Sequence, residues 1–472
     1  MTTGIREVRS RAGQGRLPWL LTLLALWIGP GAESVSGQTS LFDPAFSDLR
    51  RASVAWDRRG GPERRVVDVV CLVPDTATFL EAVAAWDEKT YFPILIDDVE
   101  YTFKFLRAFR PARIVRYPTR ATSLSGPALW DRAVKAVGQA WSSRAGEAQM
   151  GDLVPRDLGP TPPGVVISAP ESQSLAAAVA LAAGRFQPLL RWQTNRTFRD
   201  VPSTQEATAM ARELAGVVGG AYPKHDQLGD DCDFVTLAGD YPYRYVAESS
   251  HNAFDDLLFR SEGSHRRWAY AGRLMGGPVE SVYRAMSALF LTPATAVMFN
   301  SYDTASQPWS GYAMTVGTNQ LNRILPTSHV VGDRATLAGW HQTFDPWNRY
   351  GLLLINTHDG PTGFHLPGGL IGQTADTPVT TPAAVVMTHS FSAAAPDDSQ
   401  TIAGRWLANG AFIFFGSVNE PYLQGFRTPT LIANALSENL PLVAAVRKTA
   451  VEPFGQPWRR SSWAIPSGAF DR

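Results

Sequence analysis

The sequence has few cysteines, no excess of basic residues and no zinc-binding motif, and each absence excludes a class of protein. Only two of its 472 residues are cysteines, Cys71 and Cys232, which excludes a disulfide-rich secreted scaffold. Basic and acidic residues are equal in number, 43 each, so the formal net charge is +0. The basic surface typical of nucleic-acid-binding proteins is therefore missing, and no nucleic-acid partner is expected. No His-Glu-x-x-His motif or paired-cysteine motif occurs, which argues against zinc.

Long apolar runs are also scarce. The run Leu17–Ile28 follows four arginines and precedes the small residues Ala32, Ser34 and Gly37. It is shorter than the roughly 20 residues that a membrane-spanning helix needs, and this order of segments is typical of an export signal. We predict a signal peptide at residues 1–37, a secreted, periplasmic or cell-surface location, and no membrane span in the mature chain. An uncleaved anchor is the alternative.

What the sequence does contain is an alternation of short apolar runs with amphipathic segments. Arg65–Val73 predicts a strand and Thr78–Trp86 a helix with one apolar face. Gly164–Ser168 and Leu175–Ala183 repeat this order, and each pair leads to a further short strand. We therefore expect an N-terminal α/β subdomain at residues 38–222 that holds two related strand–helix–strand units. The two cysteines lie in or beside such strands, so both a disulfide and two buried free thiols remain open.

The rest of the chain continues the alternation up to residue 459. The predicted strands are Phe234–Ala238, Ala296–Asn300, the run that starts at Leu352, Ala383–Thr388 and Ala411–Phe415. The predicted helices are Pro278–Leu289, Ala335–Thr343, Ile402–Asn409 and Thr430–Glu438. Strands that alternate with helices indicate an α/β fold built on largely parallel, doubly wound sheets.

Two of these strands end in residues that carry chemistry. The first runs from Gly351 to His358, and the second from Ala383 to Ser390. Continuous apolar runs are typical of parallel strands covered on both faces. Because functional residues gather at the carboxyl edge of such sheets, His358 and Ser390 are the candidate catalytic pair.

The order of motifs resembles the gingipain-type cysteine peptidases, which have a caspase-like fold. The motifs are Gly239-Asp240, the pair Asp255-Asp256, Gly272-Arg273, Thr357-His358, the strand that ends at Ser390, and Gly416-Ser417. The resemblance covers residues 223–459. Residues 38–222 resemble, more weakly, a smaller α/β subdomain or cell-wall-binding repeats. The tail at residues 460–472 departs from the hydrophobic strand that closes the family's domain, and a frameshift near Arg459 is one hypothesis for it.

The resemblance implies that a histidine at one strand end activates a cysteine at the next. His358 matches the histidine, but Ser390 stands in the place of the cysteine, and Asp359 precedes Gly360 where the family has glycine. Gly360 is the candidate for oxyanion or loop support. A serine needs a well-aligned base, and no Gly-x-Ser-x-Gly motif surrounds Ser390. We therefore predict a degenerate, catalytically silent member of the family.

Further candidates lie in loops. Asn419, Glu420 and Tyr422 follow a strand end and could line a ligand pocket, or form a packed turn instead. A calcium site formed by Asp240, Asp255 and Asp256, with Asp303 nearby, is conceivable because calcium prefers oxygen ligands; turn-capping aspartates are the commoner explanation. His389 is expected to be structural, since it faces away from its neighbour on the strand. No other cofactor is expected.

Three functions follow from these observations. The leading prediction is a non-catalytic peptidase homologue that binds peptide, protein or cell-wall polymer at the cell envelope or outside the cell. The first alternative is an active hydrolase that uses Ser390 and His358. The second is a cell-wall-binding scaffold in which the repeats at Arg65–Trp192 attach the protein to wall polymer.

Overall fold

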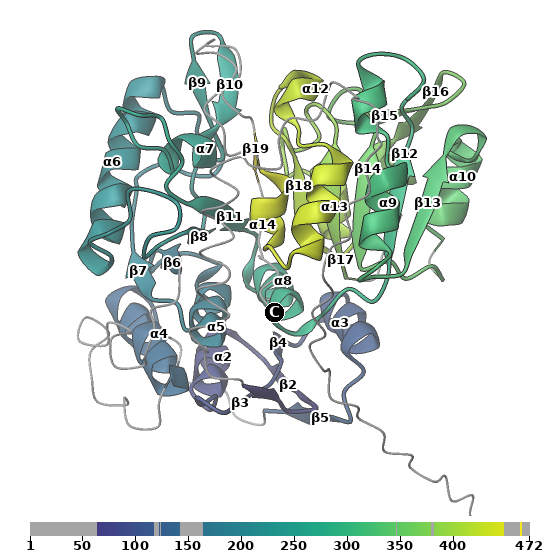
Figure 1. The fold of residues 1–472 in the computed structure, drawn as a ribbon. Helices are drawn as coiled ribbons and strands as arrows, with labels where there is room; N and C mark the ends of the chain where they lie inside the picture. The colour runs from purple at the N-terminus through teal and green to yellow at the C-terminus, as the bar shows by residue number, and fades with distance from the viewer. Residues whose placement is uncertain are drawn as a thin grey trace, which may run out of the picture. The chain divides into compact units, whose positions relative to one another are not determined.

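The computed structural model describes residues 64–117, 122, 124–141, 164–345, 347–378, 382–447 and 463–464. Its elements confirm the α/β prediction: parallel sheets of six, four and three strands carry most of the chain, with helices against them (Figure 1). The predicted signal peptide lies outside the described residues and stays a prediction. Within the described residues, no helix is long and apolar enough to cross a bilayer.

The six-stranded sheet holds both strands of the predicted catalytic pair. Its strands are, in spatial order, β13 (Thr327–Val331), β12 (Ala296–Asn300), β14 (Leu352–Asn356), β17 (Ala383–Thr388), β18 (Ala411–Ser417) and β19 (Trp463–Ala464). All are parallel except β19, which pairs antiparallel with Gly416 and Ser417 of β18. These two residues of β19 are the described part of the atypical tail.

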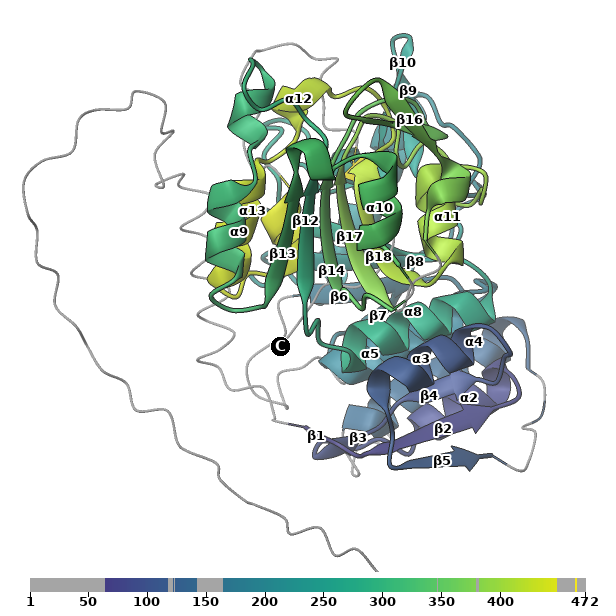
Figure 2. The same ribbon diagram turned by 90° about the vertical axis from the view of Figure 1, so that its right-hand side faces the viewer.

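Helices cover both faces of this sheet, which explains its continuous apolar strands (Figure 2). One face carries α9 (Thr315–Leu321), α13 (Pro429–Ser437) and α14 (Leu442–Val446), and the other α10 (Leu337–Thr343) and α11 (Ile402–Ala408). Along β14, Leu352 and Leu354 join the core cluster on the first side, whereas Leu353 and Ile355 join that on the second. Because successive side chains of a strand point to opposite faces, each face receives its own apolar set.

The four-stranded sheet has the order β11 (Tyr270–Leu274), β8 (Phe234–Ala238), β6 (Gly164–Ser168), β7 (Leu189–Arg191), and all its pairs are parallel. Helix α5 (Leu175–Arg185) packs on one face and α6 (Thr204–Ala221) on the other. The sheet joins strands from both sides of the boundary expected at residue 222. Hydrogen bonding between β6 and β8 therefore makes the two predicted regions share one sheet.

The three-stranded sheet has the order β4 (Ile94–Ile96), β2 (Val69–Val73), β5 (Arg113–Arg116). The parallel units β2–α2–β4 and β6–α5–β7 are the two predicted strand–helix–strand units, with α2 at Thr76–Val83. They belong to different sheets. Helices α3 (Tyr101–Phe109), α4 (Gly126–Trp141), α5 and α8 (Pro278–Phe290) lie between the three-stranded sheet and the rest of the chain (Figure 2).

Several elements were not predicted from the sequence. They are α4, α6, α9, α14, β11, β13, the hairpin β9 (Arg244–Ala247) and β10 (Ser250–Ala253), and the hairpin β15 (Gly363–Leu366) and β16 (Leu370–Gln373). Short pieces complete the fold: β1 (Arg65–Val66), β3 (Thr90–Tyr91), α7 (Phe254–Leu258), α12 (Tyr422–Gly425) and the 3-10 turns at Trp309–Tyr312, Gly332–Arg334 and Thr374–Asp376. The predicted strand Arg65–Val73 is thus split into β1 and β2.

The cysteines are both free and buried. Cys71 lies in β2 of the three-stranded sheet, whereas Cys232 precedes β8 and packs in the core around α6. Burial raises the pKa of both thiols. The structure therefore has two free thiols and no disulfide between them. Cys71 lies in the three-stranded sheet, whereas Cys232 lies beside the four-stranded sheet.

Candidate functional site

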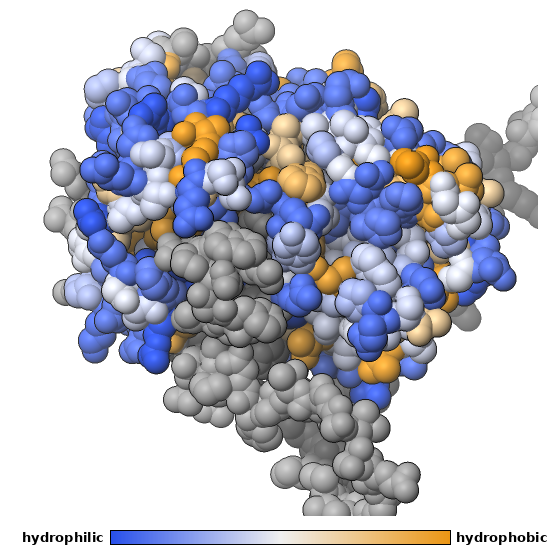
Figure 3. Space-filling model, turned by 90° about the horizontal axis from the view of Figure 1, so that it is seen from above, coloured by the Kyte–Doolittle hydropathy of each residue, from blue (hydrophilic) through white to orange (hydrophobic). Residues whose placement is uncertain are grey.

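The candidate site lies at the carboxyl edge of the six-stranded sheet. Strand β12 comes first along the chain, and its successors β13 and β14 lie on opposite sides of it. In open α/β sheets, the carboxyl ends of the strands at such a reversal of order, here β12 and β14, are the usual position of ligands. The carboxyl edge lies at the top of Figure 1, and Figure 3 shows that face to be mainly hydrophilic with separate apolar patches.

His358 follows β14 and is exposed at this edge. Its ring stacks on two others: the centroid of Trp309 lies 5.2 Å away and that of His365 4.6 Å away, with interplanar angles of 24° and 27°. Tyr302 lies under the stack, 4.4 Å from Trp309 between centroids. The hydroxyl of Tyr302 lies 2.8 Å from the carbonyl of Thr357 and 2.9 Å from that of Thr388, so it ties the ends of β14 and β17 together.

The surroundings favour the neutral form of His358. Desolvation lowers the pKa of its imidazole below the usual 6.5, and His365 lowers it further, against the raising effects of Asp359 and Glu420. A neutral imidazole keeps a lone pair that can accept a proton. His358 therefore has the protonation state of a general base at neutral pH, and its use as one depends on what lies within hydrogen-bond reach.

Ser390 sits in a turn that is fastened to the end of β18. The amide of Phe391 donates to the Asn419 carbonyl over 3.1 Å, and the amide of Ala393 donates to the Ser417 carbonyl over 2.8 Å. Phe391 adopts the left-handed conformation, with a φ of 57°. These contacts bring the turn after β17 against the segment Asn419–Tyr422, so two groups of sequence-predicted candidates meet here.

The hydroxyl of Ser390 donates to Glu420 Oε1 over 2.7 Å. The same oxygen accepts the backbone N–H of Tyr422 over 2.8 Å. Among the residues that the structure describes, no hydrogen bond joins Ser390 to His358. The structure thus places both predicted residues at one sheet edge but pairs the serine with a carboxylate. The predicted serine–histidine mechanism requires the imidazole to be aligned with the hydroxyl, and that contact is not made.

Asp359, which follows His358, has a strained backbone. Its φ is 150°, in a region that residues with a Cβ avoid and glycine adopts freely. The backbone conformation at this position is therefore one that suits glycine better than aspartate. Beside Gly360, the candidate for oxyanion or loop support, an added Cβ would meet no atom within 4 Å, so this residue borders open space.

His389 is structural, as expected. It is buried, with Nε2 3.0 Å from the carbonyl of Gly363 and Nδ1 2.5 Å from the carbonyl of Ser390. Burial lowers the pKa of its imidazole to about 4. The neutral ring, which has one N–H to donate, lies buried between β15 and the turn after β17.

The three pocket candidates have different surroundings. Asn419 donates from its side chain to the carbonyl of His251, and so links the site to the β9–β10 hairpin. Glu420 is exposed and receives the two hydrogen bonds described above. Tyr422 has a left-handed φ of 53° and leaves 52% of its surface exposed. The segment is thus both a hydrogen-bonded turn and an open surface beside Ser390.

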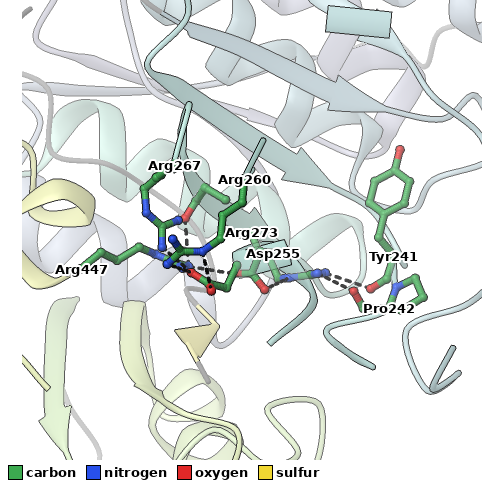
Figure 4. A network of polar contacts seen from close by, with 9 residues as sticks. Tyr241, Pro242, Asp255, Arg260, Arg267, Arg273 and Arg447 are labelled. Carbon is green, nitrogen blue, oxygen red and sulfur yellow. Dashed lines mark hydrogen bonds and ion pairs between the residues drawn. The ribbon is translucent and has the colours of Figure 1, made fainter. Parts of the chain in front are cut away.

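The calcium candidates are not brought together. Asp255 lies between Arg273, at 3.3 Å, and Arg447, at 2.7 Å. Asp256 lies between Arg260, at 2.9 Å, and Arg267. All of these side chains are largely buried, and Figure 4 shows the arginines converging on the two carboxylates. Two guanidinium groups on each carboxylate leave no negative charge for a cation.

The other two aspartates are separate from this network. Asp303 accepts the amide of Ala305 over 3.1 Å, which is a turn cap, and Asp240 is exposed after β8. Within the described parts of the chain, no three histidine, cysteine or acidic side chains are grouped so that they could hold a metal ion. The structure therefore gives no support to calcium.

Sequence reasoning missed Tyr302 and the ring stack. Tyr302 follows β12, and its position became significant only once β12 was known to lie beside β14. Three tryptophans, Trp309, Trp340 and Trp347, lie near His358 in the sequence. Trp340 is buried in the core, and Trp347 precedes β14 at the opposite, amino-terminal edge. Of the three tryptophans, only Trp309 belongs to the site.

Comparison with known proteins adds little. No protein family matched the chain, and no curated protein matched it either. A solved structure described as "Structure of Protease" is similar, with a TM-score of 0.45 and 12% sequence identity, over 65% of this chain and 77% of that one.

Proposed function

We propose that this chain is an exported, gingipain-like protein that binds an extended polypeptide segment at the carboxyl edge of its six-stranded sheet and does not cleave it. The hydrogen bond from Ser390 to Glu420 carries the proposal. A hydroxyl is far less acidic than a thiol and has no reserve of ionised form at neutral pH. A carboxylate beside it further disfavours an alkoxide, since like charges repel.

The ring stack supports binding. Trp309 and His358 present aromatic surface at this sheet edge, and Tyr422, which is 52% exposed, lies beside Glu420. Aromatic residues supply large contact areas at binding sites at low cost in side-chain entropy. Glu420 adds a carboxylate that can accept hydrogen bonds from the backbone N–H groups of an extended segment.

Digestion of a polypeptide tests the absence of cleavage. Full-length protein incubated with reduced, carboxymethylated α-lactalbumin is expected to give no new fragments by mass spectrometry. Fragments that are lost in Ser390→Ala would contradict the proposal and support the alternative of an active hydrolase.

Binding is tested with the same polypeptide by biolayer interferometry. We expect Trp309→Ala to weaken binding by about tenfold, the usual effect of losing one aromatic anchor. Trp347→Ala is the matched control, because Trp347 is 85% exposed at the amino-terminal edge, and it should bind like the wild type. Equal affinities of Trp309→Ala and Trp347→Ala for the polypeptide would show that it binds elsewhere. If the protein is retained on peptidoglycan and does not bind the polypeptide, the alternative of a wall-binding scaffold is favoured.

A further inference from the structure

A cavity of about 500 Å³ opens at the carboxyl edge of the four-stranded sheet. Its walls come from the segments that follow the strands: Phe198 after β7, Gln173 after β6, Asp240 after β8 and Met275 after β11. Leu407, at the end of α11, closes it from the other side. A space of this size accommodates a small molecule. The site proposed above uses none of these residues.

The position of the cavity in the fold is that of a ligand site. Strand β6 is the first of its sheet along the chain; β7 lies on one side of it and β8 on the other. Helices α5 and α6, which make the two connections, cover opposite faces. The strand order therefore reverses between β6 and β8, and in open α/β sheets such a reversal leaves a crevice where ligands bind.

Arg284 brings an unpaired positive charge to the wall of this cavity. It is 5% exposed, and its Nη1 donates to the Met275 carbonyl over 2.6 Å. Its Nε is buried without a partner. No carboxylate of the described residues forms an ion pair with it, and its Nη2 makes no hydrogen bond to them. A buried guanidinium is costly unless its charge is compensated. Glu280, one turn earlier on α8, acts on it electrostatically without forming an ion pair, so among the described residues the free N–H groups of Arg284 still lack a hydrogen-bonded anion.

Negative charge also lines the cavity. Asp240 is exposed there, and among the described residues its carboxylate has no hydrogen bond or ion pair. Glu280, in the first turn of α8, also lines the cavity. One of its carboxylate oxygens lies next to Gly277, 2.7 Å from the position that a Cβ of this residue would occupy. The other charged lining residues, Arg199 and Asp397, are already paired with each other at 2.8 Å. The free charges are therefore one cation, Arg284, and two carboxylates.

We propose that this cavity binds a free amino acid as its zwitterion, with the carboxylate at Arg284 and the ammonium group at Asp240 and Glu280. One ligand then supplies a partner for charges of both signs, which an inorganic anion or a simple amine does not. The apolar walls at Phe198, Met275 and Leu407 accommodate a hydrophobic side chain. The preferred ligands are thus leucine, methionine or phenylalanine rather than acidic or basic amino acids.

Calorimetric titration of the full-length protein tests the inference. L-Leucine, L-methionine or L-phenylalanine should bind with a dissociation constant below about 1 mM. Two analogues of leucine test the charges without any mutation: 4-methylpentanoate lacks the ammonium group, and isopentylamine lacks the carboxylate. Each should bind at least about tenfold more weakly, as expected when a charge-assisted hydrogen bond is lost.

Variants test the residues. Asp240→Asn should weaken binding about tenfold or more, because the ammonium group of the ligand loses a charged partner. The fold should be unaffected, because the Asp240 carboxylate makes no contact within the described structure. Asp333→Asn, a matched change at an exposed aspartate in the 3-10 turn after β13, should bind like the wild type. Trp309→Ala should also leave amino-acid binding intact, which separates this inference from polypeptide binding. The inference is overturned if none of the three amino acids binds. It is also overturned if 4-methylpentanoate or inorganic phosphate binds as tightly as leucine, or if Asp240→Asn leaves the affinity unchanged.

Discussion

Ser390 and Glu420, thirty residues apart in the chain, are joined by a hydrogen bond of 2.7 Å from hydroxyl to carboxylate. This contact gives the serine a partner other than His358. It also places a negative charge beside the position that a thiol occupies in the family that the chain resembles. Predictions about reactivity at this position depend on that charge.

Replacing the serine by cysteine tests the effect of the charge. In Ser390→Cys we expect a thiol pKa above the usual value of about 8.5, because the Glu420 carboxylate disfavours the thiolate. The pH dependence of alkylation by iodoacetamide measures it. The variant should show no peptidase activity.

Adding Glu420→Gln to Ser390→Cys should lower the thiol pKa, since the repelling charge is gone. The wild type is the background control, because its two cysteines are buried and should alkylate slowly. A midpoint below 8.5 in the single variant, or turnover that disappears with His358→Ala, would show that the site is poised for catalysis.

The buried ion pairs of Asp255 should be important for stability. Asp255→Asn leaves the charges of Arg273 and Arg447 without a compensating carboxylate, which should lower the free energy of unfolding by about 3 kcal/mol or more. Urea denaturation measures the loss. The control is Glu262→Gln, which removes the solvent-exposed pair with Arg212 and should change stability little. Similar losses in both variants would contradict the importance of burial.

His389 should make stability depend on pH. Its folded-state pKa of about 4 lies below the usual value of 6.5, so between these values the unfolded chain binds a proton that the folded protein excludes. The free energy of unfolding should therefore be fully maintained above pH 6.5 and fall by about 3 kcal/mol as the pH drops towards 4. Chemical denaturation across this range should show the fall, and His389→Gln should make it shallower. An unchanged slope in the variant would assign the effect to other groups.

The strained backbone at Asp359 predicts a stabilising substitution. Glycine adopts a φ of 150° without steric cost, so Asp359→Gly should raise the free energy of unfolding by about 1 kcal/mol, the strain relieved less the entropy that glycine loses on folding. Thermal unfolding measures the change. Asp345→Gly, in a loop with ordinary φ, should instead be destabilising. A loss of stability in Asp359→Gly would show that the carboxylate contributes more than the strain costs.

Much of the fold followed from periodicity alone. Strands with continuous apolar sequence, such as Leu352–Asn356 and Ala383–Thr388, were predicted because both of their faces are covered. The β9–β10 and β15–β16 hairpins were missed because their short strands lack a distinct apolar pattern. Helix α6 was missed although its start carries a capping box at Ser203 and Glu206, a signal that could have been found.

The sequence by itself determined the α/β class and the positions of His358 and Ser390 at strand ends, because these depend on local patterns of apolar residues. Only the tertiary structure decided their partners. Strand order put Tyr302 and Trp309 beside His358, and the turn after β18 brought Glu420 to Ser390. The same applies to Asp255 and Asp256, which the sequence presents as possible metal ligands and the fold surrounds with arginines. Contacts between residues far apart in the chain depend on packing, which no local pattern encodes.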